Sequence, residues 1–340
     1  MDNIETIDAH GMYVSAGFID LHIHGAGGAD VMDATKEALF TISDTILQTG
    51  TTSFLATTMT MSTQNIHRSL ENIDKNAKYL NGANIVGIHL EGPFINSSKS
   101  GAQDKKYIEK PNFQLIENYM SKIKMLTIAP EVDGAKEFIE FMNAKYPEII
   151  LSIGHSNANY SEAKESFAWG VTHATHLFNA MNPYHHREPG IIGAVFDSTV
   201  TCDIIADLIH THPSTLELVS RVKKDKLILI TDSMRAGCMK CGSYTLGGQS
   251  VEVKNGKATL SDGTLAGSVL KLNEALLNMY NNTSMNRVEV VEAVTKLPAQ
   301  KLALKKGELK VGYDADIVIF DEKFSIMSTI VNGQVKYKRG

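Results

Sequence analysis

Short apolar runs rich in strand-forming residues alternate along the chain with longer amphipathic stretches. In three of these stretches, residues 36–50, 63–80 and 159–170, apolar positions recur with the spacing of one helix face. The apolar runs predict eight strands, which end near Gly25, Met59, Phe94, Glu131, Ser156, Phe178, Ile209 and Met234. Strand and helix thus alternate at roughly 20 to 40 residues per unit. This order predicts an α/β fold, a (β/α)8 TIM-type barrel over residues 16–304.

A doubly wound parallel sheet would show the same alternation of strands and helices. It usually carries a G-x-G-x-x-G fingerprint where the first helix opens. The segment HGAGGAD, residues 24–30, is rich in glycine but lacks that spacing. The barrel is therefore the preferred interpretation.

The two ends of the chain have a different pattern from the middle. Residues 307–340 alternate apolar and polar positions and contain turn signals, including the pair Asn332-Gly333. Residues 4–17 have a similar character. Because a few strands alone are marginally stable, we expect residues 1–15 and 305–340 to pair into one small β domain beside the barrel.

Composition narrows the environment of the protein. The net charge is −5, and no long block of lysine or arginine occurs, so binding to nucleic acid or to a membrane surface has no support. The first 20 residues lack a basic segment followed by an apolar run, and no stretch of about 18 apolar residues occurs. These features predict a soluble, cytoplasmic protein.

The three cysteines, Cys202, Cys238 and Cys241, are too few for a disulfide scaffold and agree with a reducing compartment. Cys238 and Cys241 form one C-x-x-C motif. A structural zinc site usually needs a second pair of ligands, and a thioredoxin-type site needs its own fold context. We therefore interpret the motif as an incidental pair in a loop.

Candidate metal ligands gather at the predicted strand ends, where barrel enzymes place their active sites. Each residue alone is more often a hydrogen-bonded core residue or a helix cap than a ligand. Together, four imidazoles and one carboxylate at one end of a barrel indicate a divalent metal, with imidazole favouring zinc or iron. The candidate ligands are His22, His24, Glu91, His155 and His176.

Asp232, at the end of the eighth predicted strand, suits another task. A carboxylate beside a metal-activated water can accept its proton and then deliver that proton to a leaving nitrogen. The alternative role is an N-cap for the following segment. The hypothesis is that Asp232 is the general base and acid of an amide hydrolysis.

A series of motifs from Gly17 to Ser268 resembles the N-acetylglucosamine-6-phosphate deacetylases, a family of the amidohydrolase superfamily. The resemblance is carried by GFIDLHIHG, GIHLEGPFIN, TIAPE, GHSNA, VTHATHLFNAMNP, REPGIIGA, IIADLIH, ITDSM and GTLAGS, in that order. The C-terminal VGYDADIVIFD is similar to the returning strand of the family's β domain. The resemblance implies hydrolysis of the linear amide of N-acetylglucosamine 6-phosphate, in amino-sugar catabolism and cell-wall recycling, by a homodimer.

The resemblance also implies roles for individual residues. Glu91, His155 and His176 would hold one metal, and His22 with His24 a second, so we expect one or two ions per subunit. Arg187 would clamp the phosphate, and His210 would reach the substrate, either that of its own subunit or one held by the partner subunit. The other implied substrate contacts are Ala102, Gln103, Asn179, Ala180, Leu265, Ala266 and Gly267.

Two features depart from the family pattern. Gln103 stands where some members have a histidine that polarises the substrate carbonyl, and we expect its amide to donate to the developing oxyanion instead. Family members usually have several more strands before the equivalent of Asp20, so the small β domain is expected to be incomplete at its N-terminus.

Two rival functions remain at this stage. Fold and metal ligands do not fix a substrate, so a cyclic-amide hydrolase or a deaminase on the same scaffold is possible. A catalytically silent sensor of metal or sugar phosphate is the second rival, but all six chemical residues are retained, which argues against it.

Overall fold

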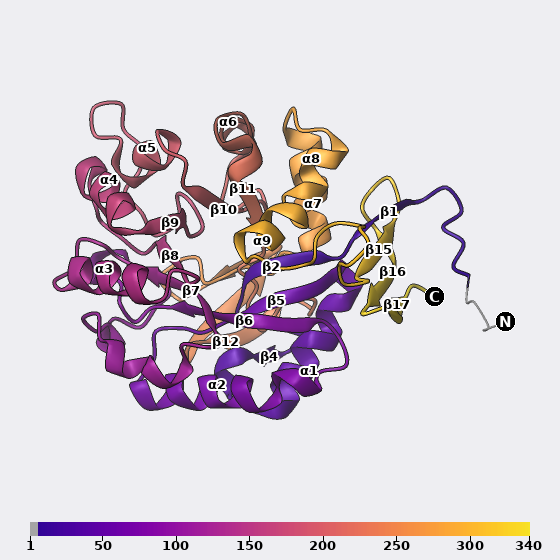
Figure 1. The fold of residues 1–340 in the computed structure, drawn as a ribbon, viewed down its shortest axis with the longest axis horizontal. Helices are drawn as coiled ribbons and strands as arrows, with labels where there is room; N and C mark the ends of the chain where they lie inside the picture. The colour runs from indigo at the N-terminus through magenta and orange to yellow at the C-terminus, as the bar shows by residue number, and fades with distance from the viewer. Residues whose placement is uncertain (1–5) are drawn as a thin grey trace.

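The computed structural model describes residues 6–340 and contains an eight-stranded parallel sheet rolled into a barrel (Figure 1). The order of neighbouring strands is β11-β10-β9-β8-β7-β6-β5-β2. Each strand ends within a few residues of the position that the sequence predicts, so the barrel prediction is confirmed. The strands are β2 (Phe18–Ile23), β5 (Thr51–Thr57), β6 (Asn84–Glu91), β7 (Ile123–Ile128), β8 (Ile150–Ile153), β9 (Val171–Ala174), β10 (Thr201–Ile205) and β11 (Leu227–Ile230).

The first and last barrel strands meet just beyond their C-terminal ends. Ile23 and Ser233 form a parallel bridge. The backbone N–H of Asp232 donates to the carbonyl of His22 at 2.9 Å, and that of His24 donates to Ser233 at 2.9 Å. The nearly closed barrel therefore brings residues from both ends of the barrel segment together at its mouth.

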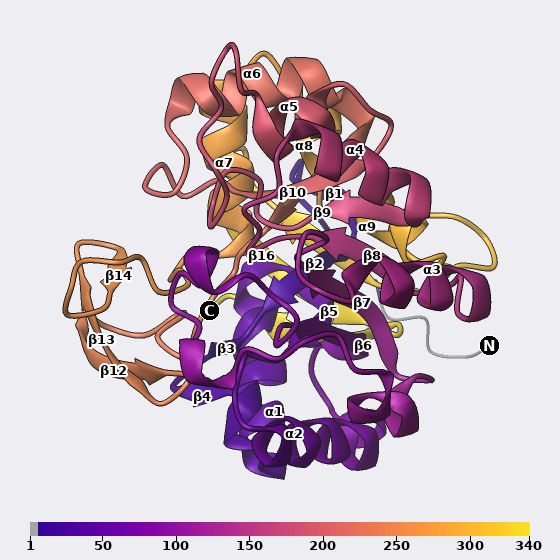
Figure 2. The same cartoon turned by 90° about the vertical axis from the view of Figure 1, so that its left-hand side faces the viewer.

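Helices pack around the outside of the barrel (Figures 1 and 2). Their inward faces carry buried apolar residues, such as Leu39 and Ile42 of α1, which join the main core. The helices are α1 (Lys36–Thr45), α2 (Thr63–Asn76), α3 (Ala135–Lys145), α4 (Tyr160–Trp169), α5 (Gly190–Phe196), α6 (Pro213–Lys223), α7 (Leu272–Asn282), α8 (Arg287–Glu292) and α9 (Lys296–Lys301). None of the helices in the described part of the chain has the length and apolar character needed to span a membrane.

The two chain ends form one antiparallel sheet beside the barrel (Figure 1). Its order is β1-β15-β16-β17, from β1 (Tyr13–Ala16), β15 (Ile317–Phe320), β16 (Ile326–Val331) and β17 (Gln334–Lys338). Asn332 and Gly333 join the last two strands with φ of 50° and 75°, as a tight hairpin turn requires. The expected pairing of the two ends is confirmed for residues 6–340.

A second antiparallel sheet, which the sequence analysis did not predict, follows the last barrel strand. It consists of β12 (Gly242–Leu246), β13 (Gln249–Lys254) and β14 (Lys257–Thr259) and projects to one side of the barrel (Figure 2). Its turns are Gly247-Gly248 and Asn255-Gly256, all four residues with positive φ. These dipeptides are ordinary hairpin signals between alternating strands, so the sequence did contain the information. A short pair, β3 (Gly25–Ala26) and β4 (Ala29–Asp30), lies beside the first strand end.

Candidate active site

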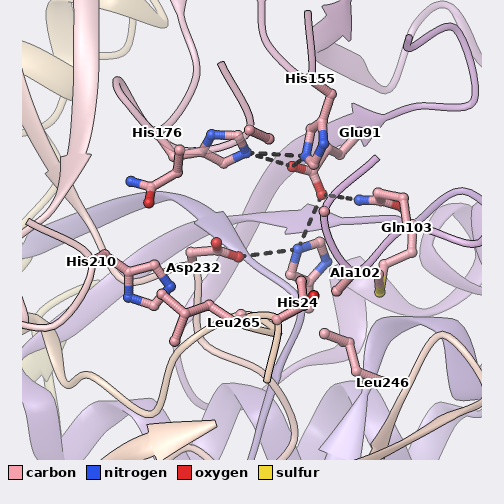
Figure 3. Close-up of a pocket in the computed structure, with 16 residues that line it drawn as sticks. His24, Glu91, Ala102, Gln103, His155, His176, His210, Asp232, Leu246 and Leu265 are labelled. Atoms are coloured by element: carbon pink, nitrogen blue, oxygen red, sulfur yellow. Dashed lines mark hydrogen bonds and ion pairs between the residues drawn. The ribbon is translucent and has the colours of Figure 1, made fainter. Parts of the chain in front are cut away.

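The predicted ligands converge at the C-terminal mouth of the barrel (Figure 3). His22 lies on β2 and His24 directly follows it, so the two imidazoles, two residues apart, leave the strand on one face. Glu91 is the last residue of β6. His155, His176 and Asp232 each lie two residues beyond the end of their strand. Backbone topology alone thus delivers six chemical side chains to one place.

Glu91 lies at the centre of the cluster. The Nε2 atoms of His155 and His176 are each 3.0 Å from its Oε1 atom, and Nε2 of His24 is 3.2 Å from its Oε2 atom. Nε2 of His22 is 3.5 Å from Oε1. One carboxylate therefore faces both predicted histidine pairs.

The first-strand histidines also face Asp232. Their Nε2 atoms are 3.1 Å apart. Oδ1 of Asp232 is 3.3 Å from Nε2 of His24 and 3.5 Å from Nε2 of His22. The carboxylate expected to move protons is thus in direct reach of the expected metal position.

The hydrogen bonds behind the imidazoles fix which nitrogen faces the cluster. Nδ1 of His24 donates to the carbonyl of Thr57 at 3.2 Å, and Nδ1 of His155 donates to that of Lys99 at 2.9 Å. When these imidazoles are neutral, their Nε2 atoms carry lone pairs that face the oxygens of Glu91. Acceptors that face one another repel unless a cation lies between them, so this donor set fits a metal.

The arrangement offers two overlapping metal positions. Among residues 6–340, two sets place one ligand atom per residue within 4.8 Å of one another, with every member buried: His22, His24 and Glu91, and Glu91, His155 and His176. A carboxylate shared by both sets can bridge two ions. The prediction of a divalent-metal site is supported, while the identity of the metal stays a prediction.

The surrounding charges keep the two carboxylates ionised. Burial raises the pKa of Asp232, but His22 and His24 outweigh this effect and lower the pKa to about 2. Burial likewise raises the pKa of Glu91, and the neighbouring imidazoles, His22 foremost, bring it well below its usual value. Two anionic groups among imidazoles are what a divalent cation requires.

Three of these side chains depend on unusual backbone conformations. His155, His176 and Asp232 have φ of 48°, 33° and 49°. Such left-handed conformations cost residues other than glycine on the order of 1 kcal/mol or more, and they persist where the surrounding structure enforces them. The fold therefore accepts strain in order to turn these side chains into the barrel mouth.

A cavity of about 210 Å³ opens above the cluster and is lined by most of the predicted site residues. His22 lies beneath it, fully buried. Asn179 has a buried amide nitrogen, Nδ2, without a hydrogen-bond partner among the described residues. The predicted residues that line the cavity are His24, Glu91, Ala102, Gln103, His155, His176, Asn179, Ala180, His210, Asp232, Leu265 and Gly267.

Two predicted substrate contacts lie elsewhere. The side chain of Ala266 is buried in an apolar cluster with Met59 and Leu246 rather than on the cavity wall. Arg187 is exposed on a surface loop, with Nη1 2.8 Å from Nε2 of His186, and does not line the cavity of this single chain. A phosphate-clamping role for Arg187 stays a prediction.

Gln103 has partners that the sequence did not reveal. Its amide nitrogen donates to Oε2 of Glu91 at 2.7 Å, and its amide oxygen accepts the backbone N–H of Thr60 at 2.7 Å. One of the two amide protons is therefore used within the protein. The second is the one available for the expected contact with an oxyanion.

Sequence reasoning missed several supporting residues. Asp20 is buried and accepts from the hydroxyl of Thr231 at 2.6 Å. Burial raises the pKa of Asp20 to about 6. His89 is fully buried, with its ring 4.6 Å from that of His22. The two-residue spacing of a strand could have predicted both, because Asp20 lies on the same strand face as His22 and His24, and His89 lies on the same face as Glu91.

His210 also has an unpredicted partner. Its Nδ1 atom lies 2.7 Å from Oδ2 of Asp207, while its ring lines the cavity. A ring nitrogen that donates to a carboxylate orients the opposite nitrogen, here toward the cavity. The cavity thus contains an oriented imidazole on the side facing away from Gln103 (Figure 3).

The fold and the donor set together define a metal-dependent hydrolase barrel, and the amidohydrolase family model matches residues 13–336. An N-acetylglucosamine-6-phosphate deacetylase from Bacillus subtilis is 42% identical over 334 residues, covering 94% of this chain and 84% of the relative. The chain therefore belongs to the N-acetylglucosamine-6-phosphate deacetylase family of amidohydrolases.

Solved structures agree with this assignment. The deacetylase of that name from Pasteurella multocida has a TM-score of 0.94 at 30% identity, covering 100% of this chain and 90% of that one. An aspartate-to-alanine mutant of the Mycobacterium smegmatis deacetylase, in complex with N-acetyl-D-glucosamine 6-phosphate, has a TM-score of 0.90 at 28% identity, covering 96% and 87%.

Proposed function

We propose that this protein hydrolyses the acetamide of N-acetylglucosamine 6-phosphate to glucosamine 6-phosphate and acetate. The observation that carries the proposal is the convergence of four imidazoles, Glu91 and Asp232 beneath one open cavity. The relative from Mycobacterium smegmatis was solved with this substrate. We also propose that this reaction serves amino-sugar catabolism and cell-wall recycling.

A divalent metal held by these ligands would polarise the amide carbonyl and lower the pKa of a water molecule. Asp232 has the position and charge to accept the proton of the attacking water, because its pKa lies far below neutral and its Oδ1 atom faces His24. The same carboxyl group then delivers that proton to the leaving nitrogen. The remaining amide proton of Gln103 is the candidate donor to the oxyanion.

The sugar phosphate would lie on the polar side of the cavity. Asn179 lines that side and has an amide nitrogen without a partner among residues 6–340, and His210 supplies an oriented ring nitrogen. Arg187 is exposed and could reach a phosphate in a neighbouring subunit, so its proposed role depends on a homodimer. We also propose two metal ions per subunit, zinc or iron, because imidazole dominates both ligand sets.

The proposed cellular location rests on the absence of disulfide bonds among the three cysteines. Cys202, Cys238 and Cys241 are all free thiols. Proteins of oxidising compartments usually pair their cysteines. We therefore propose that the enzyme works in the cytoplasm.

Acetate release is the direct test. Purified protein loaded with zinc or iron should release acetate and a free amine in equal amounts from N-acetylglucosamine 6-phosphate. Asp232→Asn keeps the shape of the side chain but removes the base, so kcat should fall by about 10²- to 10⁴-fold. Absence of acetate, or an Asp232→Asn variant as active as the parent, would refute the proposal.

A further inference from the structure

The cavity has two unlike walls on either side of the metal ligands. Asn179 and His210 line the polar side of the cavity; the amide nitrogen of Asn179 is buried without a partner among residues 6–340, and Nδ1 of His210 is held by Asp207. Met59, Ala102 and Leu246 form an apolar wall. Figure 3 shows His210 on one side of Asp232, and His24, Ala102 and Leu246 on the other. A substrate that spans the cluster therefore meets opposite chemistry at its two ends.

The apolar wall is a rigid part of the core. Met59 and Leu246 are 2% and 1% exposed, and both belong to an apolar cluster that includes Val251 and Val253 of β13. The turn after Leu246 lies against Met59, because a Cβ added at Gly247 would be in van der Waals contact with its Cε atom, at 3.4 Å. Side chains held this way cannot move aside without opening a cavity.

A hydrogen bond ties this wall to the metal ligands. Nε2 of Gln249, on β13, donates to the carbonyl of Ala102 at 2.6 Å. Ala102 directly precedes Gln103, whose amide nitrogen donates to Glu91. The distance between the apolar wall and the metal ligands is therefore set by short contacts at both ends.

We infer that Met59 and Leu246 form the pocket for the N-acyl chain and limit that chain to acetyl. The inference deepens the proposed function and rests on it. The reacting carbonyl must lie at the metal ligands and Asp232, and the anionic sugar phosphate needs the polar wall. The remaining substituent of the carbonyl, an apolar methyl group, then points to the apolar wall. A longer chain overlaps two buried side chains.

The test uses N-acetyl, N-propionyl and N-butanoyl glucosamine 6-phosphate as a series. For the metal-loaded parent protein, each added methylene should lower kcat/KM by about 10-fold or more. Leu246→Ala and Met59→Ala should raise the propionyl-to-acetyl ratio of kcat/KM by about 10-fold, and Leu246→Val should raise it less. The milder Leu246→Val variant keeps the test valid if the alanine variants do not fold.

Val251→Ala is the matched control. Val251 is fully buried in the same apolar cluster but does not line the cavity. The Val251→Ala substitution should loosen the β12–β14 sheet without changing the propionyl-to-acetyl ratio of kcat/KM. A change in that ratio as large as that of Leu246→Ala would overturn the inference, because the effect would then come from a loosened sheet.

Binding separates failure of the inference from failure of the proposed function. Calorimetry on metal-loaded Asp232→Asn protein should give a Kd about 10-fold lower for the acetyl than for the propionyl compound, a preference that Leu246→Ala removes. Equal affinities for all three compounds overturn the acyl pocket alone. Absence of binding by all three overturns the proposed function and the pocket with it.

Discussion

The amide of Gln103 has a fixed orientation because each end has one possible partner. The backbone N–H of Thr60 can only donate, so the amide oxygen of Gln103 must face it. The nitrogen is then directed to Oε2 of Glu91. Such a contact behind a metal ligand holds the carboxylate in place, which makes Gln103 a positioning residue for Glu91 as well as a candidate oxyanion donor.

Gln103→Ala should therefore weaken metal binding. Loss of a contact that orients a ligand typically lowers metal affinity by about 10- to 100-fold. Titration of zinc into metal-free protein by calorimetry measures this effect without relying on turnover. Gln103→Glu serves as the comparison, since a carboxylate beside Glu91 repels it. Unchanged zinc affinity in Gln103→Ala would leave only the oxyanion role.

Arg187→Ala tests whether the surface arginine contacts phosphate. A charge-assisted, bidentate contact is worth about 1.5–3 kcal/mol, so KM for the phosphorylated sugar should rise by about 10- to 100-fold. The unphosphorylated sugar should be almost unaffected. Arg221 is the matched control, because it is an exposed arginine on α6 that pairs with Glu217 and lies outside the cavity lining. Equal effects of both substitutions would assign the change to net charge.

The sequence predicts the candidate metal ligands of this site better than the groups that hold those ligands in position. Two-residue spacing in β2 and the strand ends place His22, His24 and Glu91, because barrel topology fixes where such positions meet. The partners of Gln103 are Thr60, in the loop after β5, and Glu91, at the end of β6, and these contacts depend on side-chain packing. The tautomers of His24 and His155 likewise depend on carbonyl groups that no sequence pattern marks.

The β12–β14 sheet is the element that the sequence analysis passed over. Its strands are only three to six residues long, and it lies where a strand-to-helix loop of the barrel is expected. Two hydrogen bonds connect it to loops at the barrel mouth, from Gln249 to the carbonyl of Ala102 and from Arg235 to the carbonyl of Thr245. By contrast, the eight barrel strands are largely buried, and several contain apolar runs such as LILI in β11, which the sequence pattern reveals.

Gln249→Ala should loosen this sheet from the barrel. The lost hydrogen bond is worth about 1 kcal/mol, which corresponds to about 5-fold faster opening-limited exchange of amide protons in β12 and β13. Hydrogen exchange followed by mass spectrometry measures this rate. KM for the substrate should rise as well, because Leu246 of this sheet lines the cavity.

Ser243→Ala is the control for that experiment. Ser243 is exposed and donates to Glu252 at 2.8 Å within the same sheet. It should leave KM unchanged. If both variants raise KM equally, general softening of the sheet explains the effect, and the tie to Ala102 has no separate role.

The metal ligands lie where the whole barrel closes. His22 and His24 come from the first strand and its end and Asp232 from the end of the last, while Glu91 comes from β6, two strands along the sheet from β2. A metal that binds only the folded chain stabilises it by about 4 kcal/mol when its concentration is 1,000 times Kd. Removal of metal by a chelator should therefore lower Tm by several degrees, and added zinc should restore it. A Tm independent of metal would contradict a bound ion at this junction.

The buried amine of Lys301 should make the free energy of unfolding of the barrel change with pH in the alkaline range. Lys301 ends α9, and its Nζ atom donates to the carbonyl and hydroxyl of Thr172 on β9, at 2.9 and 3.0 Å. Burial lowers the pKa of Lys301 from 10.5 to about 8. Below pH 8 the amine is charged in both folded and unfolded chains, so the folded state bears the full cost of burying the charge. Between pH 8 and 10.5 only the unfolded chain keeps the proton, and the contribution of Lys301 to the free energy of unfolding rises with pH.

Lys301→Met removes this titration while keeping most of the side-chain volume. The free energy of unfolding of parent minus variant should therefore increase by about 1–2 kcal/mol between pH 7.5 and 10, after allowance for partial solvent screening. Urea unfolding at several pH values measures the difference and cancels the titration of all other groups. Loss of the two hydrogen bonds to Thr172 shifts that difference by a constant amount and leaves its slope intact. If the free energies of unfolding of parent and variant change with pH in parallel, solvent reaches Lys301 freely and burial does not lower its pKa.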